Sequence, residues 1–469
     1  MQTDCTLGQL EFQGAFRRKV VGAFDAGRVS SDGGVLLLRE TAERTGLLNR
    51  FAACFRDHRN PALVEHTVEQ LIAQRVYGIA CGYEDLSDHD TLRDDVLFAV
   101  AAGKRDAVGE KRLRRTDRGH ALAGKSTLNR LELTPAEADA SSRYKKVVYD
   151  GEAIDSLFVD LFLDGHKRPP TEIVLDLDAT DDPVHGNQEG RFFHGYYGHY
   201  CYLPLYIFCG DDLLLARLRK ADIDASAGSL EEVERIVAQI RRRWPKVKIT
   251  LRADSGFARD GLMAWCEAND VDYVFGLARN GRLEKMIEAE LESAKLEHER
   301  TGQPARSFKE LRYRTLDSWA RERRVVAKAE QISGKANPRF IVTSFPVEKI
   351  DPRSLYEDVY CARGDMENRI KEQQLDMFAD RTSSHTMRAN QLRLWLSSLA
   401  YTLVVQLRRL GLRGTALADA QVGTIRTRLL KVGALVKLSV RRIQISLSSV
   451  FPLQRLFHQA LANLQRLRE

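Results

Sequence analysis

The chain has 469 residues and a net charge of +7, and this length suggests about two to four structural units rather than one compact core. Hydrophobic residues make up 43%, but no apolar run reaches the roughly 18 residues of a membrane span, which argues against a membrane protein. Seven cysteines without a C-x-x-C pair argue against a disulfide framework or a zinc site. Because the first residues also lack a secretion signal, a cytoplasmic protein is expected.

Residues 1–170 are expected to form a helical N-terminal DNA-binding domain. Apolar residues recur there at helical spacing, and the double proline at 169–170 marks its end. Between Gly103 and Arg130, nine Lys or Arg stand against three acids, which is the charge pattern of a polyanion site. Lys125 and Arg130 are therefore candidate contacts to DNA phosphates, and the alternative is a solvated basic surface.

One stretch of this basic region, Gly119-His-Ala-Leu-Ala-Gly-Lys-Ser126, fits the phosphate-loop pattern G-x-x-x-x-G-K-[ST]. Such a loop needs a buried strand before it and a helix after it. The preceding residues are charged and contain no β-branched apolar run, so they do not predict a central strand. We interpret the match as coincidental and expect no nucleotide cofactor.

After the double proline, short apolar strands alternate with amphipathic helices. The order β-β-β-α-β-α-β is typical of a mixed sheet with helices packed on it, so residues 171–280 are expected to form the first part of an α/β core. The five predicted strands lie in TEIVLDLDAT, YCYLPLYIFCG, DLLLARLRKA, VKITLRADSG and VDYVFGLAR.

The rest of the chain is predicted in three parts. Residues 281–349 combine a charged helix with short alternating runs, which indicates a β-rich insertion. Residues 350–410 are predicted to be helical and to complete the core. Residues 411–469 form a basic C-terminal segment, with a hairpin-like alternation and a last helix, that is expected to contact DNA or a second subunit.

Two of the predicted strands end in carboxylates. Asp176 and Asp178 lie in VLDLDAT, and Asp254 lies in LRADSG. Alternate residues of a strand share a face, so Asp176 and Asp178 are expected to point the same way. A helix cap or a turn acid would explain each position by itself.

A predicted helix carries the third acid. Tyr360, Arg363 and Glu367 are spaced i, i+3 and i+7, with Lys371 one turn further along the same face. This mixture predicts a metal-binding acid beside groups that hold DNA phosphates. A salt-bridged surface is the alternative.

Asp178, Asp254 and Glu367 together resemble the DDE triad of cut-and-paste transposases with an RNase H-like fold. The motifs DAT, RADSGF and Tyr-x-x-Arg-x-x-x-Glu are similar to those of the hairpin-forming insertion-sequence branch, and most like those of the family named after insertion sequence thirteen-eighty. Further motifs such as SWARERRVV and NPRFIVTS extend the resemblance over nearly the whole chain. One position departs from the branch pattern: Gln374 stands where a lysine is expected seven residues after the glutamate.

The resemblance implies an RNase H-like mixed five-stranded sheet with flanking helices, a β-rich insertion before the catalytic Glu367, and a helical N-terminal domain. It also implies that Asp178, Asp254 and Glu367 bind two Mg²⁺ ions, for which Mn²⁺ can substitute, and catalyse DNA strand cleavage and strand transfer. Trp319, in the insertion, is implied as the platform for a flipped base. A core position is the equal alternative for this residue.

The partners implied by the resemblance are double-stranded DNA, both transposon ends and target, and a second copy of the chain bound to the same DNA. Two rival functions remain at this level. One is a catalytically inert DNA-binding protein, and the other is a plain nuclease of the same fold.

Overall fold

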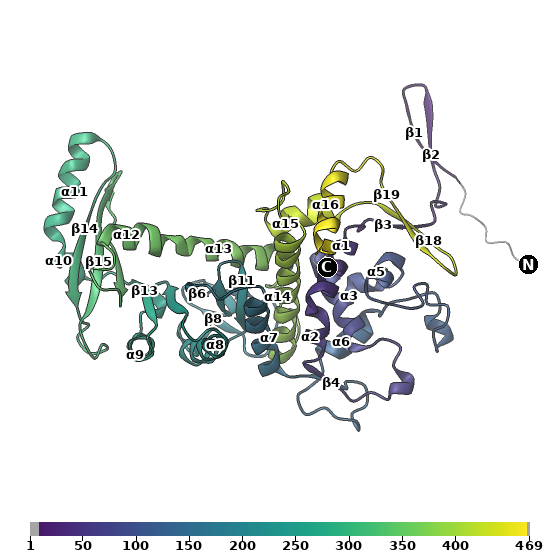
Figure 1. The fold of residues 1–469 in the computed structure, drawn as a ribbon, viewed down its shortest axis with the longest axis horizontal. Helices are drawn as coiled ribbons and strands as arrows, with labels where there is room; N and C mark the ends of the chain where they lie inside the picture. Colours follow the sequence, from purple (N-terminus) through teal and green to yellow (C-terminus); the bar gives the residue numbers. More distant parts are fainter. Residues whose placement is uncertain (1–8, 467–469) are drawn as a thin grey trace, which may run out of the picture. The chain divides into compact units, whose positions relative to one another are not determined.

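The computed structural model describes residues 9–466, and the chain divides into two compact units. The first unit is built from both ends of the chain, Met1–Val148 and Leu399–Glu469, whereas the second is the continuous segment Tyr149–Ser398. Figure 1 is coloured along the sequence, so the first unit contains both the purple-to-blue elements of the N-terminal part and the yellow elements of the C-terminal part. Helix α7 (Gly151–Asp164) precedes the double proline and belongs to the second unit.

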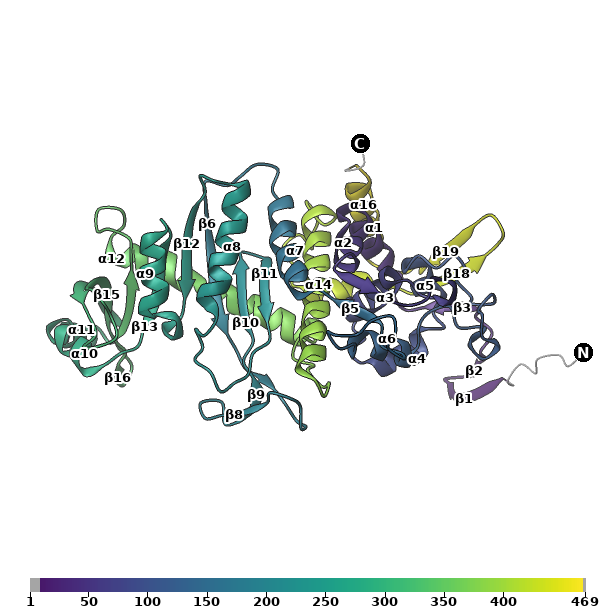
Figure 2. The ribbon, with the colours of Figure 1, turned by 90° about the horizontal axis from the view of Figure 1, so that it is seen from below.

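The second unit is built on one mixed sheet with the strand order β11-β10-β6-β12-β13-β17-β15-β14. Strands β6, β12 and β13 run parallel, β10 pairs antiparallel with β6, and the edge strand β11 pairs antiparallel with β10 (Figure 2). The predicted order of strands and helices in this part is confirmed. The strands are β6 (Glu172–Ala179), β10 (Leu205–Cys209), β11 (Asp212–Arg217), β12 (Lys248–Ala253) and β13 (Asp272–Leu277).

The sheet has nine strands instead of the expected five, because the insertion extends the core sheet. Strand β17 pairs antiparallel with β13, so the edge of β13, which would otherwise present unpaired backbone groups, is covered. The expectation of a five-stranded sheet was therefore wrong in size. The insertion comprises α10 (Gly281–Met286), α11 (Glu288–Thr301), β14 (Ala305–Tyr313), β15 (Arg323–Ile332), β16 (Lys335–Ala336) and β17 (Arg339–Thr343).

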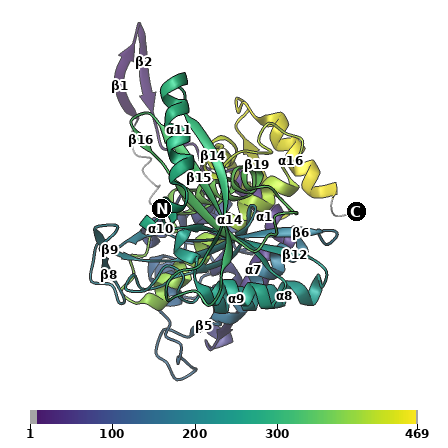
Figure 3. The same ribbon diagram turned by 90° about the vertical axis from the view of Figure 1, so that its left-hand side faces the viewer.

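Three helices, α7, α8 (Ser229–Arg243) and α9 (Asp260–Ala268), cover one face of the sheet (Figure 3). Leu175 and Leu177 of β6 pack into the apolar core that these helices form with the strands. Alternation along the strand therefore places Asp176 and Asp178 on the opposite face, as predicted.

A helical segment from Pro352 to Asp376 packs on this second face, where Leu355 and Tyr356 contact Val274 and Ile341 of the sheet. Its geometry changes along its length, with π-helical turns at both ends of the α-helical part. Such turns are frequent at functional sites. The parts are α12 (Pro352–Ser354), the π-helical η5 (Leu355–Tyr360), the 3₁₀-helical η6 (Cys361–Arg363), α13 (Gly364–Lys371) and the π-helical η7 (Glu372–Asp376).

Two further elements complete the second unit. A small antiparallel sheet with the order β7-β9-β8 follows β6 directly, and its strands are β7 (Asp182–Pro183), β8 (Phe192–His194) and β9 (His199–Tyr202). The long helix α14 (Met387–Leu410) runs on into the first unit.

The first unit combines helices with several short strands, some of which the sequence did not signal. The predicted C-terminal hairpin, β18 (Ala434–Leu438) and β19 (Ile443–Leu447), is confirmed, and β18 also pairs with β3 (Arg28–Ser30). Both ends of the chain therefore share one three-stranded sheet. Within residues 9–466, no helix combines the length and apolar character that crossing a membrane requires.

The remaining elements of the first unit are short. Its helices are α1 (Val35–Thr45), α2 (Leu47–Ala52), α3 (Val68–Ala80), α4 (His89–Leu92), α5 (Val96–Ala101), α6 (Lys125–Glu132), α15 (Val422–Ile425) and α16 (Gln454–Arg466). Its other strands are β1 (Leu10–Ala15), β2 (Arg18–Gly22), β4 (Phe55–Asp57) and β5 (Val147–Tyr149).

Candidate active site

The first two predicted acids lie at the ends of adjacent parallel strands. Asp178 is the second-last residue of β6, and Asp254 follows β12 directly. Because Ala253 of β12 pairs with Leu177 of β6, Asp254 comes next to Asp178 at the same edge of the sheet. The carboxyl ends of parallel strands are the usual place for a ligand site in an α/β sheet.

Asp254 is also a helix cap, which was one explanation of this position from the sequence. Its Oδ1 accepts a hydrogen bond of 2.8 Å from the backbone N–H of Gly256, and it caps the 3₁₀ helix η4 (Ser255–Phe257). One carboxylate oxygen therefore holds the turn after β12, which fixes the direction of the side chain.

Glu367 joins the site through Arg363. The guanidinium of Arg363 lies 2.6 Å from Oε1 of Glu367 and 3.4 Å from Oδ2 of Asp178. The pair Arg363–Glu367 is one helical turn apart, so the helix presents both side chains toward the end of β6. One cation thus links an acid on a strand to an acid on a helix from a distant part of the chain.

The electrostatics of Asp178 show how closely these groups lie. Burial raises the pKa of Asp178 to about 7, although the guanidinium of Arg363 lowers it. The neighbouring carboxylates of Asp254 and Glu367 raise this pKa further, because like charges disfavour ionisation. Asp254 and Glu367 therefore both lie close enough to Asp178 to affect its ionisation.

Gly276 makes room for the third group of the predicted helix face. A Cβ atom at Gly276 of β13 would lie 2.6 Å from Oη of Tyr360 and 2.8 Å from the backbone nitrogen of Ser255. Only a glycine lets the phenol pack against the turn that Asp254 caps. Burial raises the pKa of Tyr360, while Arg363 beside it lowers this pKa.

The donor chemistry of this cluster fits Mg²⁺ or Mn²⁺, which prefer hard carboxylate oxygens. Burial, and after it the carboxylates of Asp254 and Glu367, raise the pKa of the partly buried Asp178, and a bound cation would relieve the repulsion between these carboxylates. As the side chains stand, Arg363 supplies the positive charge. Within residues 9–466, no group of three or more His, Cys, Asp or Glu is arranged so that it could hold a metal ion.

Comparison with known families decides the class of the protein. The family described as transposase DDE domain group 1 matches residues 12–469. The chain belongs to this family. Its members are DNA transposases, and hence phosphoryl-transfer enzymes, which confirms the predicted class.

Comparison with individual proteins adds little to the family assignment. Among solved structures, a cryo-EM structure of a piggyBac transposase synaptic complex with hairpin DNA is similar, with a TM-score of 0.40 and 11% identity, over 86% of this chain and 81% of that chain. Among curated proteins, none matches the chain.

The end of the helix in this DDE transposase has Gln374 where the branch pattern has a lysine. Lys371 is exposed on α13, one turn beyond Glu367. Gln374, at the position of the expected lysine, donates a hydrogen bond of 3.0 Å from Nε2 to the backbone oxygen of Asp181. Gln374 therefore ties the helix to the segment that follows Asp178.

Trp319 lies in the core of the insertion, between β14 and β15, rather than with the acids. It is 5% exposed, its ring packs edge-on against Tyr313 at 5.8 Å, and the guanidinium of Arg323 lies 5.5 Å from its centre. Neither face is open to a base as the side chain stands. The core position that was the alternative for Trp319 accounts for all of these contacts.

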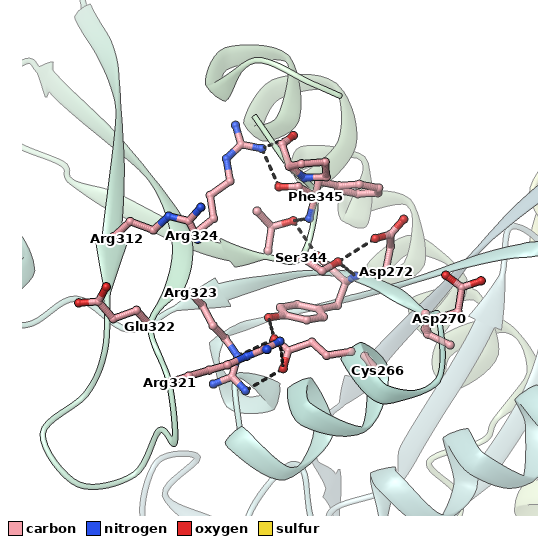
Figure 4. A pocket seen from close by; sticks show the side chains of 15 residues that line it. Cys266, Asp270, Asp272, Arg312, Arg321, Glu322, Arg323, Arg324, Ser344 and Phe345 are labelled. Carbon is pink, nitrogen blue, oxygen red and sulfur yellow. Dashed lines mark hydrogen bonds and ion pairs between the residues drawn. The ribbon is translucent and has the colours of Figure 1, made fainter. Parts of the chain in front are cut away.

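A hollow of about 460 Å³ beside β13 and β15 contains this Arg323 (Figure 4). Two of its arginines are paired: Arg323 donates to Asp260 and Glu267, and Arg321 lies 2.5 Å from Glu267. None of the three predicted acids lines this hollow. Because Arg321 and Arg323 are held by these acids, we interpret the hollow as structural support for the insertion.

The first unit contains the other two predicted DNA contacts. The Lys125 ammonium lies 2.9 Å from Oδ2 of Asp90, so its charge is already paired. Arg130 lies over the ring of Tyr144 at 5.1 Å. Between Gly103 and Gly124 the structure has a 3₁₀ turn and no strand, so the structural context of a phosphate loop is absent there.

A cluster of aromatic residues beside Asp178 was not assigned from the sequence. Phe192, Phe193, Tyr196 and Tyr200, in and around the hairpin β8–β9, are all exposed. Their neighbour Tyr197 has its pKa raised to about 12 by burial and by the carboxylates of Asp181 and Asp178. The aromatic density of RFFHGYYGHY was the available signal for this surface.

Proposed function

We propose that this chain is the transposase of an insertion sequence of the hairpin-forming, cut-and-paste branch, most like the family named after insertion sequence thirteen-eighty. It binds the ends of the element, cuts the DNA and joins it to a target. Family membership supports the class of reaction. The observation that carries the site is the single guanidinium that connects Asp178 and Glu367, next to Asp254.

Asp178, Asp254 and Glu367 would hold the divalent ions that DDE transposases use. When bound, two Mg²⁺ or Mn²⁺ ions neutralise the scissile phosphate and activate the attacking water or 3′-hydroxyl. The two strand ends position their aspartates rigidly, because β6 and β12 are central strands of the sheet. The helix brings Glu367 as the third ligand.

Arg363 and Tyr360 would hold the phosphate next to the cut. The guanidinium can form paired hydrogen bonds with phosphate oxygens, as it does now with carboxylates. Its contact with Asp178 is long at 3.4 Å, so the pair can be exchanged for a phosphate at little cost. Lys371, exposed on the same helix, would contact the backbone further along.

Double-stranded DNA is the partner in this proposal, as both transposon ends and target. The basic regions of the first unit, including Arg130, would bind the ends, and the C-terminal basic segment would contact DNA or a second copy of the chain. We infer a homodimer on DNA, in which each copy holds one end.

Incubation of the protein with end-bearing DNA fragments and Mg²⁺ tests the proposal directly. The wild type should nick and join these fragments, as seen on a denaturing gel. Asp178→Asn, Asp254→Asn and Glu367→Gln should each reduce the rate by at least about 10³-fold, equal to about 4 kcal/mol in the barrier, and should still bind DNA. Asp365→Asn, an exposed acid on the same helix, is the matched control and should cut normally.

Each rival function makes a different prediction in this assay. An inert DNA-binding protein would bind the ends without cutting them in any metal. A plain nuclease would cut but never join. A nucleotide hydrolase would turn over ATP and lose this activity in Lys125→Ala, which we do not expect because Asp90 pairs with Lys125.

A further inference from the structure

The first unit contains a basic pocket of about 200 Å³ beside helix α6. Its lining contains two acids, Glu65 and Asp117, and five basic residues. The five lining cations are Arg59, Arg112, Arg114, Arg130 and Lys146.

Only part of this positive charge is compensated. Arg112 donates two hydrogen bonds of 3.0 Å to the carboxylate of Glu65, and Arg59 lies 2.6 Å from Asp57. Arg114, Arg130 and Lys146 form no ion pair with any residue in the part of the chain that the structure describes. The pocket therefore has a net positive charge that its own acids do not balance.

His66 adds an unused hydrogen-bond donor to the lining. It is only 5% exposed, and its Nδ1 lies 3.2 Å from the ammonium of Lys104. An ammonium can only donate, so Nδ1 is the acceptor and the proton of the neutral ring is on Nε2. Burial and the charges of Lys104 and Arg112 lower the pKa of His66 to about 3, so the ring is neutral at physiological pH.

Nε2 of His66 has no hydrogen-bond partner among the described residues. A buried donor without an acceptor is costly, and such groups usually mark a missing ligand or water. Here the missing partner must be an acceptor, and the three cations without an ion pair favour an anion over a neutral acceptor. A phosphate group meets both conditions.

An exposed aromatic ring at the mouth of the pocket points to nucleic acid in particular. Tyr144 lines the pocket and is 57% exposed. The guanidinium of Arg130 lies 5.1 Å from the centre of its ring and that of Arg143 lies 4.9 Å from it. This arrangement holds two cations over one flat surface, where an elongated polyanion can contact both.

We propose that the pocket lined by His66, Arg114, Arg130 and Lys146 binds a backbone phosphate of duplex DNA. The inference rests on the proposed function, since it assumes that the chain acts on DNA, and it adds the place where the first unit grips the duplex. Arg130 belongs to this pocket, whereas Lys125 does not line it. Free phosphate or a nucleotide shares the same chemistry, and the experiment separates these sources.

The test is the affinity of the full-length protein for labelled duplex DNA, measured by fluorescence anisotropy in EDTA at several salt concentrations. Each contact between a cation of the protein and a DNA phosphate releases about one counterion on binding, so a variant that lacks one contact releases one fewer. Arg114→Gln and Arg130→Gln should therefore each weaken binding about fivefold at about 0.15 M salt and reduce the slope of log Kd against log salt by about 1. Arg115→Gln is the matched control, because Arg115 is the next residue, is also exposed and does not line the pocket.

Two results would overturn the proposal. One is an equal loss of affinity in Arg115→Gln and Arg114→Gln, which would show a general surface charge and no pocket. The other is binding of inorganic phosphate or ATP, at constant ionic strength, to the wild type but not to Arg114→Gln, while the two proteins bind DNA with equal affinity. That result would assign the pocket to a free phosphate compound.

The same proteins distinguish this proposal from the catalytic one. With Mg²⁺, Arg114→Gln should need more DNA than the wild type to reach half of its maximal cutting rate, because the contact with DNA is weakened. Asp178→Asn should bind normally and fail to cut. If the wild type binds as described but never cuts, the catalytic proposal fails while the pocket stands.

Discussion

Two aspartates stand two residues apart on β6, on the same face, and each faces an arginine. Asp176 is 4% exposed and accepts two hydrogen bonds from Arg252, at 2.5 and 2.8 Å. Asp178, with a side chain 16% exposed, has one contact of 3.4 Å with Arg363, which also serves Glu367. The same residue types at equivalent strand positions therefore form two very different pairs.

The difference separates a structural pair from a site. Arg252 lies on β12 and donates its remaining contact to the backbone oxygen of Val359, so Asp176 and Arg252 satisfy each other in one fixed arrangement. Arg363 divides its charge between two carboxylates, and Asp178 also faces Asp254. An incompletely compensated acid is the one that can accept a cation.

The largest expected effect is the loss of the fixed pair. Arg252→Met should reduce the free energy of unfolding by about 3–5 kcal/mol, because Asp176 would stay buried without its counter-charge. Urea unfolding at pH 7 measures this. Arg363→Met should cost less than about 1 kcal/mol at pH 7, since Asp178 can take up a proton there. Equal losses in the two variants would remove the distinction between the pairs.

The second prediction is a gain of stability at the site itself. An unfolded aspartate has a pKa near 3.8, and that of Asp178 is raised to about 7 in the folded chain. Between these values the folded state binds more protons, so the stability of the wild type falls as the pH rises through this window. Asp178→Asn has no proton to lose, so it should be more stable than the wild type at pH 8.

Each pKa unit corresponds to about 1.4 kcal/mol, so this gain should reach at most about 4 kcal/mol at pH 8 and vanish near pH 4. Thermal or urea unfolding with a chelator present measures it across the pH range. A gain that is independent of pH would show that the charge of Asp178 is not its origin. If Asp178→Asn is more stable than the wild type but no longer cleaves DNA, the aspartate at this position lowers the stability of the wild type in return for activity.

Local pattern was enough to predict the core strands and the acids, but not their partners. Short apolar runs that end in carboxylates identified β6 and β12, and the pairing of these strands in the structure puts Asp178 and Asp254 at one edge of the sheet. The pairing of β17 with β13 depends on contacts between distant segments. The apolar and polar residues of β17 would alternate in the same way if this strand belonged to a separate small sheet. The size of the sheet could therefore not be read from the sequence.

The limits at the site have the same origin. Asp176 and Asp178 have the same local signal, and only the positions of Arg252 and Arg363 in the fold tell them apart. Trp319 fitted either a base platform or a core residue, because its sequence context does not show what packs on its ring. Gly276 gave no signal, since a glycine in a strand does not reveal which atoms approach it.

The third prediction tests that close approach. In Gly276→Ala the new Cβ would meet Oη of Tyr360 at 2.6 Å and the nitrogen of Ser255 at 2.8 Å. We expect a loss of about 1–3 kcal/mol in stability and reduced cleavage, because Tyr360 and the Asp254 turn must move. Gly281→Ala is the control, since nothing lies within 4 Å of its Cβ and it begins helix α10. Similar behaviour of both variants would mean that the packing at Gly276 is not tight.

The smallest expected effect concerns Gln374, which occupies the position of the expected lysine. Gln374→Ala removes the hydrogen bond to the backbone oxygen of Asp181 and should cost about 0.5–1.5 kcal/mol in urea unfolding. Gln374→Lys should recover most of this, because an ammonium can donate to the same oxygen. Cleavage at saturating DNA should change little in either variant. If Gln374→Ala instead loses cleavage while keeping its stability, the position acts on DNA as the lysine of the branch would, and its contact with Asp181 is incidental.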